Sequence, residues 1–262
     1  MDIPNHAPSP DPVAQRRADR ARLRRAVLIS AVFVGLLWWI KLFEHWLGAF
    51  SGLSLRPGEW QGLIGILTAP LLHGSVGHLA ANTLPLLVLG ALSLSVYPKA
   101  SVRAWPLIWV LSGIGVWLVG RPPAHLGASG LSHGLMFFLF VLGLVRRDRA
   151  AIAAGMIAFF LYGGMLMTVF PREQGISWEY HLFGALAGIG AAVWLRTADP
   201  PLPRKRYSWE DEDDAAPADP DTEELRLPRP HGVPVLWQRP DDDARGQVLP
   251  FRPRRPPEPP GD

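Results

Sequence analysis

The stretch HLGASGLSHGLMFFLFVLGLV, residues 125–145, opens with a serine among small residues and continues as an almost unbroken apolar run. Gly127 and Gly130 lie close on either side of Ser129, and the apolar run over about 131–145 follows at once. In a lipid bilayer such a run satisfies its backbone hydrogen bonds only as a helix. Ser129 therefore lies where a predicted membrane helix begins.

The same kind of apolar run recurs along the chain, in which hydrophobic residues make up 48% of 262. A helix needs about 20 mostly apolar residues to span a bilayer, and about 17 can suffice. Each run reaches this length alone or with the small residues at its ends. A soluble protein would instead need six adjacent helices that are apolar on every side. We therefore predict an all-α polytopic membrane protein with six transmembrane helices, at about 26–47, 79–97, 104–120, 131–145, 150–170 and 182–195.

Lys and Arg in short loops predict the orientation of these helices. Most lie before the first run or after the second, fourth and sixth, at Arg16, Arg17, Arg20, Arg22, Arg24, Arg25, Lys99, Arg103, Arg146, Arg147, Arg149, Arg196, Arg204, Lys205 and Arg206. The opposite loops hold only Arg56, Arg121 and Arg172, with Lys41 near the end of the first run. We predict that both termini are cytoplasmic, and we expect a bacterial cytoplasmic membrane.

Three parts follow from the composition: a basic N-terminal segment (1–25), a six-helix domain (26–197) and a tail (198–262). No A-x-A site closes the first apolar run, which favours a retained helix over a cleaved signal peptide. Residues 1–206 carry 19 Lys and Arg against 9 Asp and Glu, whereas residues 207–262 carry 7 against 14. The basic residues lie at helix ends rather than along one stripe, which argues against nucleic-acid binding. The Pro- and Asp-rich tail predicts a disordered cytoplasmic segment, and its partners are unknown.

Polar side chains gather at the outer ends of three predicted helices. Ser129 lies on the fourth helix, His181 on the sixth, and His73, His78 and Asn82 on or just before the second. Polar groups are costly in a membrane, so they usually mark a functional site that faces the protein interior. We expect these side chains to form one site.

The residue types suit acyl transfer. A serine hydroxyl becomes a nucleophile when a base, usually histidine, takes its proton. Glu179 lies two residues from His181 and is expected to point elsewhere, so we predict a Ser129–His181 dyad rather than a triad. The backbone N–H of the serine can stabilise an oxyanion. His78 and Asn82 share a helix face at spacing i, i+4 and could add two donors.

Glycines on two of these helices follow the G-x-x-x-G spacing, Gly130 and Gly134 on the fourth and Gly184 and Gly188 on the sixth. Small residues at this spacing let membrane helices approach backbone to backbone. The spacing also occurs in ordinary helix packing. Beside a serine on one helix and a histidine on the other, it predicts an approach that brings the two within reach.

Together these motifs resemble the rhomboid intramembrane serine proteases, which carry G-x-S-G, H-x-x-G-x-x-x-G and H-x-x-x-x-H-x-x-x-N on the fourth, sixth and second helices. This chain has GASG at Gly127–Gly130 and HLFGALAG at His181–Gly188. His73, His78 and Asn82 match the third spacing. The resemblance covers about 26–197.

The resemblance implies that Ser129 is the nucleophile and His181 the general base. It implies an oxyanion hole from the Ser129 N–H, His78 and Asn82, with His73 in a supporting role. The expected reaction is hydrolysis of a peptide bond in a transmembrane protein substrate, near its outward-facing end, through an acyl-enzyme. It uses no metal and no cofactor, and the lipid bilayer is the other expected partner.

The chain departs from the family pattern in two places. His133 stands where the family often has a tyrosine stacked on the catalytic histidine, and its i, i+4 relation to Ser129 makes it a rival base. We favour His181. In the first outer loop Trp60 is followed by Gln61, where the family commonly has arginine. His125 is interpreted as a loop residue without a role.

Two other classes of function compete with the protease. One is a non-catalytic rhomboid-like protein that binds or escorts membrane clients, although such relatives usually lose the serine or the histidine. The other is a transporter, which would call for charged or discontinuous helices at the midplane. The predicted spans carry no acidic residue there.

Overall fold

The computed structural model describes residues 12–122, 124–171 and 177–200. Within these ranges the chain is helical, and its one β-type pairing is an isolated bridge between Leu55 and His125. The longer helices are α1 (Pro12–Leu47), α3 (Val76–Val96), α4 (Pro98–Val119), α5 (Ser129–Arg146), α6 (Arg149–Tyr162) and α7 (Trp178–Leu195). The shorter ones are α2 (Gly65–Thr68) and the 3-10 helices η1 (Ser51–Leu53), η2 (Trp60–Ile64), η3 (Ala69–Leu71) and η4 (Gly163–Val169).

Among the described residues, five helical segments are long and apolar enough to cross a membrane, namely Val13–Leu47, Val76–Val96, Pro98–Val119, Ser129–Arg146 and Arg149–Val169. The chain is therefore a multi-pass integral membrane protein. Each segment overlaps one of the predicted spans. α7 overlaps the sixth predicted span but is not among the five, because its first turn carries Glu179 and His181 and lowers its hydropathy. A sixth span and the orientation of the termini stay predictions.

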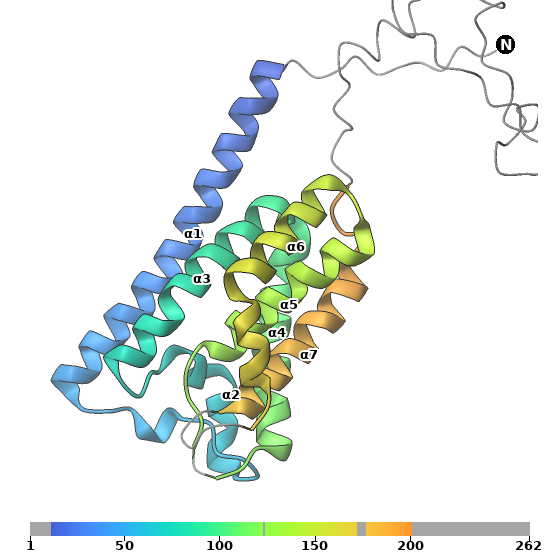
Figure 1. Cartoon of the computed structure of the whole chain (residues 1–262). Coiled ribbons are helices and arrows are strands. Elements are labelled where there is room, and N and C mark those ends of the chain that lie inside the picture. The colour runs from blue at the N-terminus through green and yellow to red at the C-terminus, as the bar shows by residue number, and fades with distance from the viewer. Residues whose placement is uncertain (1–11, 123, 172–176, 201–262) are drawn as a thin grey trace, which may run out of the picture. The chain divides into compact units, whose positions relative to one another are not determined.

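α5 lies at the centre of the bundle and packs against α3, α4, α6 and α7 (Figure 1). Its buried side chains include Leu131, Leu135, Phe138, Leu139 and Leu142, which belong to the main hydrophobic core. α1 runs along the outside of the bundle and packs on α3 (Figure 1). α5, which begins at Ser129, is thus central, whereas α1 is peripheral.

Two serines cap the N-termini of the helices α3 and α7, whose first turns carry polar residues of the site. Ser75 precedes α3, and its hydroxyl accepts the His78 backbone N–H at 3.0 Å. Ser177 precedes α7, and its hydroxyl accepts the Tyr180 N–H at 3.3 Å. Such N-caps satisfy backbone donors that a helix start leaves free. They set the first turns on which His78 and His181 lie.

The helical domain continues past its predicted end at residue 197. Asp199 is buried, and its carboxylate accepts the backbone N–H groups of Lys99 at 3.0 Å and Ala100 at 2.8 Å in the first turn of α4. Arg146 donates to the backbone oxygens of Arg196 and Asp199, both at 2.9 Å. Asp199, which the composition places in the tail, packs against the start of α4. The rest of the predicted tail, from residue 201, and Arg172 lie outside the described residues.

Candidate functional site

Ser129 is the first residue of α5, at the end of a loop that glycine shapes. Gly127 has a φ of +115°, which L side chains rarely adopt, and a Cβ there would lie 2.6 Å from the His78 ring. The loop therefore needs glycine both for its backbone and for the close imidazole. At the start of α5 the Ser129 N–H has no acceptor within the helix, as for any first-turn residue. Such an N–H is available to an oxyanion.

Ser129 and His181 line one cavity of about 830 Å³. The wall also includes His78 and Asn82 from α3, His133 from α5 and Thr168 from η4. In the described part of the chain no hydrogen bond joins the Ser129 hydroxyl to His181. Catalytic hydrogen bonds are often long in the absence of substrate, so the lack of a hydrogen bond between Ser129 and His181 here is compatible with a dyad.

The hydrogen bonds of His181 decide which of its nitrogens is free. Its Nδ1 lies 3.0 Å from the backbone oxygen of Thr168. A carbonyl only accepts, so Nδ1 carries the hydrogen and, in the neutral ring, Nε2 keeps its lone pair. The Thr168 carbonyl thus orients His181 as a carboxylate orients histidine in a triad. Nε2 is the nitrogen that can take a proton.

His133 stacks on His181, with ring centroids 3.9 Å apart and planes 10° from parallel. Its Nδ1 donates to the Ser129 backbone oxygen at 2.7 Å, and its Nε2 lies 2.8 Å from the Thr168 hydroxyl. Both nitrogens of His133 are therefore engaged. The ring stands where the family pattern has a stacking tyrosine, and its hydrogen bonds argue against the rival-base interpretation.

His78 and Asn82 lie on the α3 side of the cavity. The Asn82 side-chain amide donates one hydrogen bond to the His78 backbone oxygen at 3.0 Å, which leaves its second N–H for another acceptor. The imidazole of His78 lies beside Gly127, two residues before the serine. Donors from α3 and from the start of α5 therefore face one cavity.

His73 supports the loop that carries the serine. It is buried, and its Nε2 accepts the Ala128 backbone N–H at 3.3 Å. Burial, together with the nearby His78 ring and the Lys41 ammonium, lowers the pKa of His73 to about 4. The ring is therefore neutral near pH 7 and can accept. Lys41 of α1 donates to the His73 backbone oxygen at 2.6 Å, which links this segment to α1.

α5 and α7 meet through their glycines. A Cβ on Gly184 would run into the backbone oxygen of Gly130, and one on Gly188 into that of Gly134. A Cβ on Gly134 would lie 2.9 Å from the Gly184 oxygen. The two backbones are thus in contact, as the G-x-x-x-G spacing predicted, and no other residue fits at these positions without a shift.

Two contacts that the sequence did not suggest tie the 121–129 loop to the start of α7. Arg121 pairs with Glu179, whose side chain is only 3% exposed, through Nε and Oε1 at 2.5 Å. His125 is buried; its Nε2 donates to the Arg121 backbone oxygen at 2.7 Å, and its Nδ1 lies 2.5 Å from the Ser177 hydroxyl. His125 therefore has a structural role, and Glu179 faces the loop. Arg121 and Glu179 are 58 residues apart, and His125 and Ser177 are 52 apart, so no local pattern indicates these two contacts.

Comparisons with known proteins agree with these motifs. The model of the Rhomboid domain matches residues 59–198. An uncharacterized protein of Mycobacterium tuberculosis is 42% identical over 173 residues, which cover 62% of this chain and 72% of that protein. An uncharacterized protein of Mycobacterium leprae is 37% identical over 174 residues, covering 62% of this chain and 68% of that protein. No solved structure matches the chain.

Proposed function

The chain belongs to the rhomboid family, and we propose that it is an intramembrane serine endopeptidase with Ser129 as nucleophile and His181 as general base. The observation that carries the proposal is the hydrogen bonding of the stacked histidines. Within the described residues His181 has a hydrogen-bond partner only at Nδ1, so Nε2 stays open in a cavity that Ser129 also lines, while both nitrogens of His133 are engaged.

The reaction follows from these groups. Nε2 of His181 takes the hydroxyl proton as Oγ of Ser129 bonds to the substrate carbonyl carbon. The Ser129 N–H, His78 and Asn82 stabilise the oxyanion. The C–N bond then breaks, and the proton moves from His181 to the leaving amine. Water attacks the acyl-enzyme, gives its proton to His181 and releases the acid, and that proton returns to Ser129.

The substrate is a transmembrane segment cut near its outward-facing end. A helix hides its carbonyls in its own hydrogen bonds, so cleavage requires a segment that unwinds readily through Gly, Pro or polar residues. The proposal includes a sixth span at α7, cytoplasmic termini and a bacterial inner membrane. Support for this orientation comes from the distribution of Lys and Arg.

The first test needs no known substrate. The full chain in detergent is treated with a fluorophosphonate probe, and the label is mapped by mass spectrometry in the wild type and in Ser129→Ala, His181→Ala and His133→Ala. We expect label on Ser129 that is lost in His181→Ala and kept in His133→Ala. Label that depends on His133 alone would reverse the roles of the histidines. A folded protein that takes no label would favour the client-binding alternative.

A further inference from the structure

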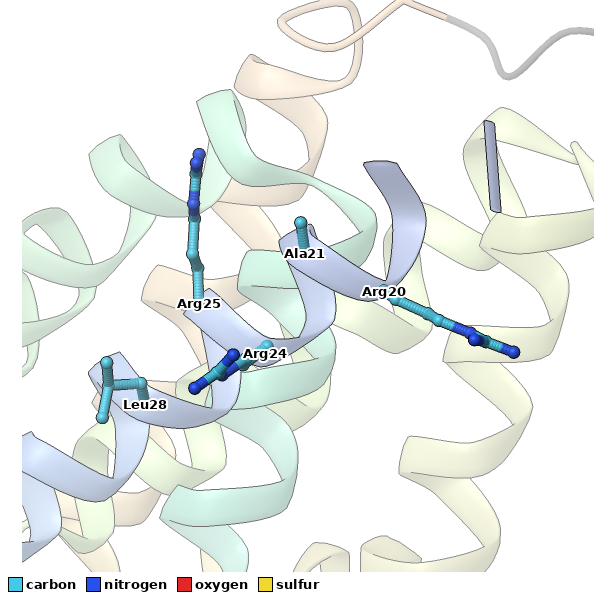
Figure 2. A pocket seen from close by; sticks show the side chains of 5 residues that line it. All are labelled: Arg20, Ala21, Arg24, Arg25 and Leu28. Carbon is cyan, nitrogen blue, oxygen red and sulfur yellow. The ribbon is translucent and has the colours of Figure 1, made fainter. Parts of the chain in front are cut away.

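A basic hollow lies on α1 just before its apolar part (Figure 2). Arg20, Arg24 and Arg25 line it together with Ala21 and Leu28, and its volume is about 480 Å³. All five residues are exposed. Among the described residues none of the three arginines forms an ion pair. Their charge therefore faces the surroundings rather than the protein.

The hollow lies away from the face of α1 that packs on the bundle. That packing face is buried at Ala26, Ser30, Val34 and Leu37. At 3.6 residues per turn, Arg20, Arg24 and Leu28 follow one another along a different side of the helix. No described helix covers this side.

An exposed apolar stripe continues from the hollow along the same side of α1. Its members follow at intervals of four or seven residues and are 57–77% exposed, at Leu28, Val32, Trp39 and Trp46. In a membrane protein such side chains face lipid tails. The arginines thus stand at the end of a lipid-facing stripe, as a phospholipid headgroup stands at the end of its acyl chains.

The arrangement of the arginines argues for lipids rather than for one small anion. Figure 2 shows the side chains of Arg20, Arg24 and Arg25 fanning out from the helix in different directions. A compact anion would be held by guanidinium groups that converge on it. Diverging groups suit a sheet of separate phosphates, as in one leaflet of a bilayer. Basic residues beside a transmembrane helix attract anionic lipids by about 1 kcal/mol each.

We propose that the Arg20–Arg24–Arg25 surface of α1 binds anionic phospholipids in the leaflet at the N-terminal end of this helix, with their acyl chains along Leu28 and Val32. The partner is the lipid itself. The inference does not depend on the protease activity, because none of these residues lines the cavity around Ser129.

The test measures binding of two fluorescent lipids with identical acyl chains, phosphatidylglycerol and phosphatidylcholine, to the full chain in an uncharged detergent. We expect the wild type to prefer phosphatidylglycerol. Arg20→Gln with Arg24→Gln should bind it about 30-fold more weakly, since two arginines contribute about 1 kcal/mol each. Arg20→Lys with Arg24→Lys should keep the preference because the charge is retained.

A matched control removes the same charge elsewhere on the same segment. Arg16→Gln with Arg22→Gln changes residues outside the hollow, one of which pairs with Asp19 at 3.7 Å, and should keep most of the preference. Equal loss in both double variants would mean that general attraction, not this surface, selects the lipid. Equal affinity of the wild type for the two lipids would overturn the proposal. Displacement of the bound phosphatidylglycerol by millimolar glycerol phosphate would also overturn the proposal, because it would indicate a site for a free anion.

Discussion

The contact between α5 and α7 differs from the packing of α1 on α3, although small and apolar residues form both. At the α5–α7 seam, formed by Gly130, Gly134, Gly184 and Gly188, two backbones touch and a methyl group has no room. On α1, a Cβ on Gly35 meets nothing within 4 Å, and side chains on its outer face are exposed. The seam leaves no room for an added methyl group, whereas the outer face of α1 has room for one. The difference predicts where substitutions do harm.

The largest contrast is expected between the two stacked histidines, His133 on α5 and His181 on α7. His181→Ala should lower the rate of fluorophosphonate labelling by about 10³-fold, within the usual contribution of a general base. His133→Phe keeps a stacking ring but loses the hydrogen bonds to Ser129 and Thr168, and we expect about a tenfold loss. Rates are measured by quantitative labelling at several times. Similar losses in the two variants would contradict the unequal roles that their hydrogen bonds indicate.

The second contrast sets the seam against α1. Gly188→Ala forces a methyl group against the Gly134 backbone oxygen and should lower the free energy of unfolding by about 3 kcal/mol, the upper part of the usual range for overpacking. Gly190→Ala on the same helix and Gly35→Ala on α1 face open space and should keep this free energy or raise it by up to about 1 kcal/mol, because alanine has the higher helix propensity. Thermal unfolding in detergent ranks the three. A Gly35→Ala variant as unstable as Gly188→Ala would remove the distinction between the two regions.

His73 links the two regions, because Lys41 of α1 binds its carbonyl and its ring accepts from Ala128 before α5. Its pKa of about 4 lies below the ordinary 6.5, so between these values the unfolded chain binds a proton that the folded chain does not. Stability is therefore full above pH 6.5 and falls as the pH drops. From pH 6.5 to 5 the loss due to His73 should approach about 2 kcal/mol.

The control for this pH dependence is His73→Asn, whose side-chain oxygen can still accept a hydrogen bond but does not titrate. The stability of the wild type should fall more steeply between pH 6.5 and 5 than that of the variant. Parallel curves would show that His73 does not carry the dependence. The quantity to compare is the difference between the two curves, because every group that the two proteins share cancels in it.

What the sequence could predict was local or periodic. Apolar length predicted the membrane helices, and G-x-x-x-G spacing predicted that α5 and α7 touch. Spacing alone leaves His133 open as a base, because its hydrogen bond to the Thr168 hydroxyl depends on how η4 packs against α7. The capping of α4 by Asp199 joins residues about 100 apart and lies beyond any pattern. Such pairings depend on tertiary packing, so only coordinates reveal them.

The smallest expected effect concerns the ion pair between Arg121, in the loop before Ser129, and Glu179 of α7. Arg121→Gln leaves the buried Glu179 carboxylate without its cation and should slow labelling about tenfold, a partial effect because Arg121 itself is 59% exposed. The matched control is Arg56→Gln, whose pair with Glu59 is exposed on both sides and should be neutral. If the Arg121–Glu179 ion pair positions the dyad, the maximal rate of inactivation by the probe falls in Arg121→Gln while the half-saturating probe concentration stays constant. Arg121→Lys should recover part of that rate, whereas a change confined to probe binding would assign Arg121 to substrate contact instead.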